Sequence, residues 1–311
     1  MPPLVYFKKQ FMPTAEAMIN IQTHALHYGT ACFEGIRGNW NQEAGQLYIF
    51  RPWEHYDRLH RSCRILKINL EHSVEELVRI TAELVERSGY REDVYIRPLA
   101  YKSSLVIGPK LHGVEDDFFV HVSTLPAYLD TEKGVKCCVS SWRRADDTMI
   151  PPRGKVTGIY VNSALAKTEA IDNGFDEAIM LNQDGHVCDG SGQNIFLVMD
   201  GKLVTPASSD NILVGVTRHT VMTLARNELG VDTVERPIDR SELYTADECF
   251  MTGTASHVTP VLEVDHRKVG GTGEIGPLTR KLMNLYFDVI RGKNPKYMEW
   301  CTPAYPKAVR A

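Results

Sequence analysis

Apolar residues recur at intervals of three and four positions in four stretches of the chain, which is the spacing of an amphipathic helix. The clearest stretch begins at a capping box formed by Ser73 and Glu76 and ends at Gly89, a residue type that commonly terminates helices. The other three predicted helices cover residues 162–172, residues 217–229 and the stretch from Pro277 to Gly292.

Strands are predicted where β-branched and aromatic residues form short runs bounded by turn residues. Such runs occupy residues 94–101, 118–124, 135–141, 177–181, 194–198 and 248–252. Hairpin turns are predicted at Asn182–Gly185 and Met199–Gly201. A polar connector at residues 126–134 separates two strand-bearing parts, so we expect a small N-terminal domain at 1–125 and a large C-terminal domain at 135–311.

Composition places the chain among ordinary globular proteins. Its 311 residues are 43% hydrophobic and 24% charged, which leaves room for two domains of roughly 100–200 residues each. The formal net charge is −4 without a basic block, so no nucleic-acid partner is expected. The apolar runs are far shorter than a spanning helix of about 20 residues, and the N-terminus lacks the pattern of a signal peptide, so no membrane partner is expected.

The cysteines and histidines give no sign of a metal site. Seven cysteines are scattered along the chain, an odd number without a Cys-x-x-Cys pair, and the eleven histidines are scattered as well. Such spacing favours reduced thiols over disulfides and argues against a zinc site. We therefore expect a cytoplasmic protein without a metal cofactor.

The stretch from His24 to Gly38 differs from an ordinary core strand or loop. It combines glycines, aromatic residues and a pair of opposite charges, namely Gly29, Gly35, Gly38, Tyr28, Phe33, Glu34 and Arg37. Glycine allows tight turns and the close approach of another group, and aromatic walls with few charges are typical of small-molecule pockets. The alternative is a strand and turn that tolerates glycine and binds no ligand.

A second unusual stretch surrounds Lys155, which lies between glycines and apolar residues in the segment from Ile150 to Tyr160. Burial disfavours the charged form of a lysine and lowers its pKa from about 10.4. A neutral amine can attack an aldehyde and form a Schiff base, which makes Lys155 a candidate for covalent cofactor binding. Taken alone, however, this stretch favours a surface lysine on a loop.

Together these stretches closely resemble class IV (fold type IV) pyridoxal-phosphate aminotransferases in their branched-chain form. The resemblance covers nearly the whole chain and is carried by segments at residues 24–38, 55–60, 155–170, 187–196, 213–218 and 253–255. It implies an α/β (α+β) fold of two domains with the cofactor at their interface and a β-barrel-like core in the larger domain. It also implies a homo-oligomer, at least a dimer, because the loop at 103–109 is expected to reach into the neighbouring subunit's pocket.

The resemblance implies pyridoxal 5'-phosphate as cofactor and Lys155 as its Schiff-base lysine, which also shuttles the proton during the reaction. Tyr160 is implied to hydrogen-bond the ring oxygen, and Asp189 to pair with the ring nitrogen. The remaining implied cofactor residues hold the phosphate or pack on the ring, and they are Arg58, Leu213, Val216, Thr217 and Thr254. For Arg58, a helix-surface arginine is the alternative.

Two positions depart from the family pattern. Many branched-chain members have glutamate where this chain has Asp189, and often glutamate where it has Gln193. Aspartate keeps the charge but is one methylene shorter, so we expect a closer backbone, a bridging water or a weaker proton affinity of the ring. An aspartate in a β-turn is the alternative.

The implied substrate residues form two groups. Thr254, Ala255 and the Tyr95 hydroxyl are implied to hold the α-carboxylate. The others line the side-chain pocket or bind the distal carboxylate of the second substrate, and they are Tyr28, Phe33, Gly35, Arg37 and Arg97. Arg97 is flanked by apolar strand residues where an unpaired charge is costly, so pairing with a carboxylate such as Glu34 is the alternative.

The implied activity is a ping-pong transfer of the amino group between L-leucine, L-isoleucine or L-valine and 2-oxoglutarate, so amino acids and 2-oxo acids are the expected partners. Two alternatives stay open: a D-amino-acid or (R)-amine transaminase or a lyase of the same fold, and a binding protein without catalysis. The loop at Ser103–Pro109 departs from the usual glycine-rich version and leaves the range of amino donors undecided. The sequence does not distinguish a dimer from a hexamer.

Overall fold

The computed structural model describes residues 3–125 and 129–306. Its chain divides into two compact units. The first unit comprises Met1–Pro126, Gly154–Gly158 and Asp288–Ala311, and the second comprises Ala127–Arg153 and Ile159–Phe287. The predicted domains differ from these units because they assigned 154–158 and 288–311 to the C-terminal domain. Residues 126–128 of the predicted connector lie outside the described residues.

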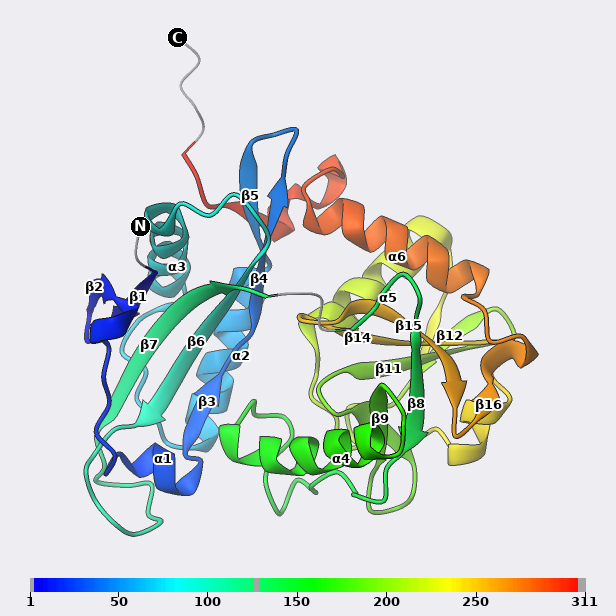
Figure 1. The fold of residues 1–311 in the computed structure, drawn as a ribbon, viewed down its shortest axis with the longest axis horizontal. Coiled ribbons are helices and arrows are strands. Elements are labelled where there is room, and N and C mark those ends of the chain that lie inside the picture. The colour runs from blue at the N-terminus through cyan, green and yellow to red at the C-terminus, as the bar shows by residue number, and fades with distance from the viewer. Residues whose placement is uncertain (1–2, 126–128, 307–311) are drawn as a thin grey trace. The chain divides into compact units, whose positions relative to one another are not determined.

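The described strands of the first unit form one antiparallel sheet, in the order β17-β5-β4-β6-β7-β1-β2 with β3 paired to β6 (Figure 1). These strands are β1 (Leu4–Phe7), β2 (Gln10–Pro13), β3 (Ala31–Phe33), β4 (Ile36–Asn41), β5 (Gln46–Phe50), β6 (Val94–Lys102), β7 (Asp116–Thr124) and β17 (Cys301–Pro303). The helices of this unit include α1 (His24–Tyr28), α2 (Pro52–Ile65) and α3 (Val74–Ser88). Helix α3 packs against α2, β1 and β7.

Helix α3 begins and ends at the residues that its sequence indicates. The Ser73 hydroxyl accepts a hydrogen bond from the Glu76 N–H at 3.2 Å, and the Glu76 carboxylate accepts one from the Ser73 N–H at 2.7 Å. Gly89 ends the helix in the left-handed conformation with φ +69°. These contacts satisfy backbone groups that the helix itself leaves unpaired. The prediction of this helix is therefore confirmed at both ends.

Strand β6 positions two of the predicted substrate residues. Its buried residues Val94, Ile96 and Pro98 alternate with the half-buried residues Tyr95 and Arg97. Because successive side chains of a strand point to opposite faces of a sheet, Tyr95 and Arg97 share one face.

The second unit is built on a closed barrel (Figure 1). The described strands pair in the order β10-β9-β8-β15-β14-β11, and pairing between β10 and β11 closes the ring. The barrel strands are β8 (Val135–Val139), β9 (Glu177–Leu181), β10 (Val187–Gly190), β11 (Asn194–Met199), β14 (Glu248–Gly253) and β15 (His257–Val264). Strands β12 (Lys202–Thr205), β13 (Thr233–Glu235) and β16 (Arg267–Lys268) extend the sheet.

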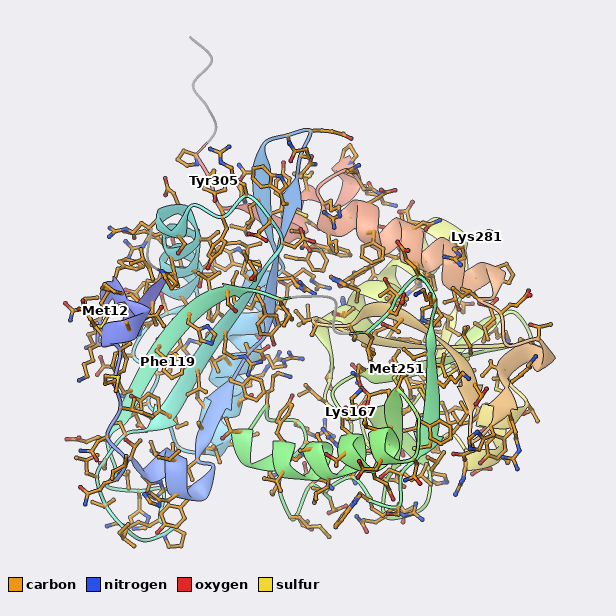
Figure 2. All side chains as sticks on the ribbon, in the orientation of Figure 1. Met12, Phe119, Lys167, Met251, Lys281 and Tyr305 are labelled. Carbon is orange, nitrogen blue, oxygen red and sulfur yellow. The ribbon has the colours of Figure 1, made fainter. Side chains whose placement is uncertain are left out.

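Closing the barrel buries a continuous apolar core inside the second unit. Met251 of β14, labelled in Figure 2, belongs to this core. Ile195, Leu197 and Val261 belong to it as well, and all four side chains are at most 2% exposed. The long helices are α4 (Tyr160–Asp172), α5 (Val216–Leu229) and α6 (Pro277–Ile290). Short 3-10 helices occur at Thr14–Glu16, Thr157–Ile159, Arg240–Tyr244, Val269–Gly271 and Pro295–Trp300. Helix α4 begins two residues before its predicted start, so Tyr160 is its first residue.

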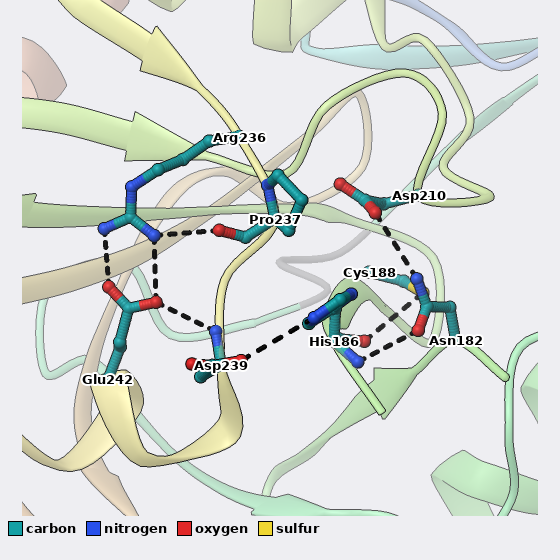
Figure 3. Close-up of polar contacts among 8 residues, drawn as sticks. All are labelled: Asn182, His186, Cys188, Asp210, Arg236, Pro237, Asp239 and Glu242. Carbon is teal, nitrogen blue, oxygen red and sulfur yellow. Dashed lines mark hydrogen bonds and ion pairs between the residues drawn. The ribbon is translucent and has the colours of Figure 1, made fainter. Parts of the chain in front are cut away.

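A polar network fixes the hairpin that leads into β10 (Figure 3). The Asn182 side chain accepts from the His186 N–H at 2.9 Å and donates to Asp210 at 3.4 Å. His186 in turn lies 3.7 Å from the Asp239 carboxylate. This network anchors the predicted turn at Asn182–Gly185, and with it the start of the strand that carries Asp189.

Among residues 3–125 and 129–306, every helix is too short or too polar to cross a lipid bilayer.

Candidate active site

The backbone of Lys155 is fixed by the first unit, although the chain on both sides of Gly154–Gly158 belongs to the second. The Lys155 N–H donates to Ser62 Oγ of α2 at 3.0 Å, and the Lys155 C=O accepts from the Phe33 N–H at 3.0 Å. Two segments that are distant in sequence thus fix the backbone position of Lys155. Its side chain is half-buried. This arrangement differs from the surface-loop lysine that the local sequence favours.

Glycines allow the two unusual stretches of the sequence to meet. A Cβ atom placed on Gly29, whose φ is +63°, would lie 2.8 Å from the Cα of Gly158, closer than such atoms approach in proteins. The Gly158 N–H and the Thr157 hydroxyl both donate to the Gly29 carbonyl, at 3.2 and 2.8 Å. The stretch at 24–38 therefore packs directly on the segment that carries Lys155.

Arg58 lies on the same helix as Ser62 and forms a buried ion pair with Glu34. Its Nε and Nη2 atoms donate to the two carboxylate oxygens of Glu34 at 2.7 and 2.8 Å. Glu34 is completely buried, and its Oε2 also lies 2.8 Å from His55 Nδ1. The alternative of a surface position for Arg58 is wrong, because the arginine is only 6% exposed.

The surroundings of Glu34 decide its charge. Burial opposes ionisation, but the Arg58 guanidinium and the hydrogen bonds from Arg58 and His55 outweigh it and hold the pKa of Glu34 well below its ordinary value. Burial lowers the pKa of His55 despite the neighbouring carboxylate. His55 is therefore neutral near pH 7, and its Nδ1–H must be the donor because a carboxylate only accepts.

Arg97 lies against aromatic rings instead of a carboxylate. Its guanidinium carbon is 4.4 Å from the Phe33 ring centroid, and its Nη2 donates to the Tyr95 hydroxyl at 3.0 Å. Within the described residues it forms no salt bridge, and its buried Nε has no hydrogen-bond partner. Pairing of Arg97 with Glu34, the alternative drawn from the sequence, is wrong because Glu34 binds Arg58 and His55.

The other predicted residues of the first unit surround this cation. Lys155 Nζ lies 4.9 Å from the centroid of the Phe33 ring, so the lysine and Arg97 both contact this ring. A Cβ atom on Gly35 would overlap the Tyr95 side chain in its present position, which favours glycine there. Arg37 of β4 is buried and is the register partner of Tyr95. An anion facing Arg97 would therefore meet a cation, a hydroxyl and an aromatic wall.

Tyr28 is tied to the loop that the sequence associates with a neighbouring subunit. Its hydroxyl accepts from the Gly108 N–H at 2.8 Å, and His24 Nε2 lies 2.9 Å from the Gly108 carbonyl. The His24 N–H donates to the Ser104 carbonyl at 3.0 Å. The loop at 103–109 is thus fastened to α1 at both of its ends.

Asp189 is a buried carboxylate in β10 of the second unit. Asn194 Nδ2 donates to its Oδ1 at 2.8 Å, the Leu213 N–H donates to its Oδ2 at 3.0 Å, and Arg144 Nη2 lies 3.8 Å from that oxygen. Burial raises the pKa of Asp189, while Arg144 and the two hydrogen bonds oppose the rise. Asp189 lies within a strand and pairs in register with Asn194, so the β-turn alternative is wrong.

The segment around Leu213 leads into the start of helix α5. The same Asn194 amide donates to the Leu213 carbonyl at 2.7 Å, and a Cβ atom on Gly215 would overlap Asn194 Oδ1. Val216 and Thr217 form the first turn of this helix of 14 residues and are buried. A helix start offers backbone N–H groups and a positive dipole end, which suits a phosphate.

Thr254 and Ala255 lie in the tight connection between β14 and β15 of the second unit. Gly253 and His257 pair in register across it, and His257 has φ +56°, which is rare for a residue with a side chain. A Cβ atom on Gly253 would lie 2.7 Å from Ser256 Oγ. The backbone of this connection is therefore closely packed against the Ser256 side chain.

Several residues with a part in this geometry were missed by sequence reasoning. Glu34 was named only as a charge and as a possible partner of Arg97, and no role was predicted for His55, Ser62, Arg144 or Asn194. Their contacts join residues far apart in the sequence, and no local pattern reveals such pairs. His55 and Asn194 lie inside the segments at 55–60 and 187–196 that carry the family resemblance, and this position is their only signal in the sequence.

The donor set fits pyridoxal 5'-phosphate in its chemistry. The first unit offers the amine of Lys155 and the cation of Arg58, and the second offers a helix start with buried Thr217 and the carboxylate of Asp189. These are a Schiff-base former, phosphate ligands and a partner for a pyridine nitrogen. Within the described residues, no three His, Cys, Asp or Glu side chains are arranged to hold a metal ion.

Comparison with known proteins points to one family. The model of the family described as amino-transferase class IV matches residues 31–264. The chain is 53% identical over 302 residues to a probable branched-chain-amino-acid aminotransferase of Aquifex aeolicus, covering 97% of each chain.

Solved structures agree with that sequence match. A branched-chain aminotransferase of Thermoproteus uzoniensis with norvaline is similar at a TM-score of 0.93 and 41% identity, covering 98% of this chain and 100% of the other. A branched-chain amino acid aminotransferase of Thermobaculum terrenum in its PLP-form is similar at a TM-score of 0.93 and 37% identity, covering 98% of this chain and 99% of the other. The predicted α/β fold of type IV with a barrel core is thereby confirmed.

Proposed function

Because the chain belongs to the class IV aminotransferases, whose members use pyridoxal 5'-phosphate, we propose that it is a branched-chain amino acid aminotransferase with Lys155 as its cofactor lysine. It transfers the amino group between L-leucine, L-isoleucine or L-valine and 2-oxoglutarate in two half-reactions. The names of its relatives support this substrate class. These relatives are named branched-chain aminotransferases, and the chain matches them over nearly their whole length.

The observation that carries the proposal is the pairing of an amine with an anion site in the first unit. Lys155 Nζ and the Arg97 guanidinium contact the same Phe33 ring, and Arg97 has no salt bridge within the described residues. A half-buried cation without a carboxylate partner costs free energy that a bound anion would offset. The distal carboxylate of 2-oxoglutarate is such an anion, whereas a branched side chain would rest on the aromatic wall.

The proposed cofactor residues act in different ways. Pyridoxal phosphate, when bound, supplies a protonated ring that withdraws electrons from the substrate carbon. Lys155 binds it through its amine and then moves the proton at the substrate Cα. Asp189 would pair with the ring nitrogen and Tyr160 would hydrogen-bond the ring oxygen. Phosphate binding and ring packing fall to Arg58, Leu213, Val216, Thr217 and Thr254.

The proposed substrate residues divide by the part of the substrate that they contact. Tyr95 and the backbone of Thr254 and Ala255 hold the α-carboxylate, and Arg97 holds the distal one. The side-chain pocket is formed by Tyr28, Phe33, Gly35 and Arg37.

We also propose that the active form is at least a homodimer. In the first unit, two fastened loops expose large apolar side chains, with Ile21 80% and Ile107 78% exposed. His24 and Tyr28 bind Gly108 of the second loop, and His27 Nε2 lies 2.9 Å from the Ile21 carbonyl of the first, so both loops are anchored to α1. Exposed apolar patches of this kind commonly mark an interface. Light scattering after gel filtration should give twice the chain mass or more, and Ile107→Asp should lower it.

A cytoplasmic location is proposed from the cysteines. All seven are reduced and buried among the described residues, as expected in a reducing compartment. Fractionation of cells of the source that express the tagged protein would test this location.

The first experiment is to record the visible absorbance of the purified protein and then add L-leucine followed by 2-oxoglutarate. The proposal expects a cofactor band that L-leucine bleaches and 2-oxoglutarate restores. A band that ignores L-leucine but responds to D-alanine or (R)-1-phenylethylamine would transfer the specificity to the other donors. Absence of a band after addition of pyridoxal phosphate, or an unchanged band in Lys155→Ala, would overturn the proposal.

A further inference from the structure

Arg144 is a buried cation whose contacts are long. It follows β8 in the second unit and is only 6% exposed, although nothing in the sequence singles it out. Its backbone is fixed, because its N–H donates to the Leu181 carbonyl at 2.8 Å and its carbonyl accepts from Gln183 at 3.0 Å. The guanidinium therefore extends from an anchored position into the interior of this unit.

The guanidinium of Arg144 is poorly satisfied compared with that of Arg58. Nη1 reaches Ser163 Oγ at 3.4 Å, Nη2 lies 3.8 Å from Asp189 Oδ2, and the buried Nε has no hydrogen-bond partner within the described residues. Burying a cation this way is costly, and a purely structural arginine would gain more from a close bidentate pair. The arrangement instead places a positive charge near a carboxylate while leaving the close positions around that carboxylate to other donors.

Those close positions are taken by neutral donors. Asn194 and the Leu213 N–H each bind one oxygen of Asp189, so Arg144 adds charge without adding a short hydrogen bond. The other cation that Asp189 senses, Arg218, is paired with Glu235 at 2.6 Å, which offsets its charge. The neighbouring Cys188 thiol is buried and its pKa is raised, so it stays neutral. Arg144 is thus the principal charge acting on this carboxyl group.

We propose that Arg144 is a positioning residue that keeps Asp189 an anion, so that this carboxylate can balance the charge of a protonated cofactor ring. The inference rests on the proposed function, because only a ring-binding role requires Asp189 to be charged. Burial disfavours the ionised form of this carboxyl group. A cation at 3.8 Å counteracts burial and still leaves the carboxylate oxygens able to accept a further hydrogen bond.

Arg144 also connects Asp189 with helix α4. Its Nη1 contact is Ser163, which lies one turn after Tyr160 on that helix. The residue proposed for the ring oxygen and the residue proposed for the ring nitrogen therefore share one cation as a structural link. Loss of the cation should loosen this link as well as change the charge of Asp189.

A double-mutant cycle on the holoenzyme tests the charge coupling by stability. The variants are Arg144→Met, Asp189→Asn and the double variant, and denaturant unfolding is measured at pH 7 and at pH 4. Because Arg144→Met favours protonation of Asp189 in the folded state, its penalty should be present at pH 7 and shrink as the pH falls toward the unfolded pKa. We expect Arg144→Met to raise the unfolding equilibrium constant about tenfold more when Asp189 is present than in the Asp189→Asn background, the equivalent of one pKa unit. Equal rises in both backgrounds would overturn the proposal.

Cofactor labelled with ¹⁵N at the ring nitrogen provides a second, spectroscopic test. Wild type should show the ¹⁵N shift of a protonated ring at neutral pH, and Arg144→Met should move the signal toward the unprotonated value. Arg144→Lys, which keeps the charge on a shorter donor, should recover part of the shift. Arg143→Met is the matched control, because Arg143 is adjacent in sequence, exposed, and donates from its side chain to the Asn182 carbonyl.

The outcomes separate the inference from the proposed function. An unchanged ¹⁵N shift in Arg144→Met with cofactor bound would overturn the inference and leave the aminotransferase proposal standing. A wild-type protein that binds no cofactor would overturn the proposed function and the ring-binding purpose of Arg144 together. The stability cycle would still decide whether Arg144 keeps Asp189 ionised.

Discussion

Each unit of the molecule contains a buried carboxylate beside an arginine, but the two pairs are built differently. Glu34 binds Arg58 through two short contacts at 2.7 and 2.8 Å, whereas Asp189 lies 3.8 Å from Arg144. The pKa of Glu34 is held below its ordinary value, and burial raises the pKa of Asp189 despite its donors. Burial is shared, so the distance and number of charged contacts decide the sign.

The difference separates a carboxylate that stabilises from one that is held ready for a ligand. Glu34 uses both oxygens to fix a cation, and removing one partner of such a pair leaves an uncompensated buried charge. Asp189 accepts from neutral amides and keeps capacity for another donor. Substitutions at these residues should therefore affect stability at Glu34 and catalysis at Asp189.

The largest effect is expected for Glu34→Gln. The substitution leaves Arg58 buried without its counter-charge, and we expect the free energy of unfolding to fall by about 3–5 kcal/mol. Urea unfolding at fixed protein concentration measures it. Glu71→Gln, which breaks an exposed pair with Lys9, is the control and should leave the urea midpoint nearly unchanged. Equal losses from both substitutions would mean that burial of the Glu34 pair has no energetic consequence.

Asp189→Asn should show the opposite profile. We expect kcat to fall roughly 10²–10³-fold, the size of effect seen when one electrostatic partner of a reacting group is removed. The free energy of unfolding should change by only about 1 kcal/mol, because one hydrogen bond is lost while a buried charge disappears. Steady-state kinetics with L-leucine and 2-oxoglutarate, paired with urea unfolding, measure both. A large loss of stability with unchanged kcat would reverse the comparison.

A smaller effect is expected for His55, which donates a hydrogen bond to Glu34. His55→Leu removes the Nδ1–H donor but leaves the pair with Arg58, so we expect a loss of about 1.5–3 kcal/mol. His55→Asn, whose amide can replace the donor, should restore part of it. Thermal unfolding of both variants measures the difference, and no recovery in His55→Asn would argue against the hydrogen bond as the cause.

The smallest effect is a difference in how the contributions of Glu34 and Asp189 to the free energy of unfolding depend on pH. The lowered pKa of Glu34 contributes stability above the unfolded value of about 4.3, and this is lost as the pH falls toward the folded value. The raised pKa of Asp189 acts in reverse, because its penalty appears as the pH rises above about 3.9. Between pH 7 and pH 4, the stability gap of Glu34→Gln from wild type should therefore narrow only at the acid end. Asp189→Asn removes this penalty, so the stability that the variant gains over wild type should shrink as the pH falls from 7 toward 4.

Local patterns predicted much of the fold. The capping box and glycine stop defined α3, and runs of β-branched residues located β6, β9, β11 and β14. The C-terminal tail carried no such signal, yet Cys301–Pro303 forms β17 on the edge of the first unit's sheet. Strand pairing between residues about 250 positions apart leaves no periodic trace in the sequence.

The residues of the candidate site could be predicted where a sequence segment matched the family. They could not be predicted where a residue acts only through its contact with a side chain distant in sequence. Lys155, Asp189 and the α5 start were named from segments of sequence, and their roles stay predictions. The partner of Arg58 was missed because Glu34 lies 24 positions away and on another element. Arg144 was missed because a buried arginine looks the same in sequence as an exposed one.

The excursion of Gly154–Gly158 into the first unit links the chemistry to the integrity of the whole chain. A fragment ending at residue 126 would contain Arg58, Arg97 and the aromatic wall but not the amine of Lys155. The lysine reaches its place only after the polypeptide has left that unit and returned for five residues. The colour of the bound cofactor would therefore report on completed folding during refolding or synthesis, and a proteolytic cut on either side of the excursion should erase it.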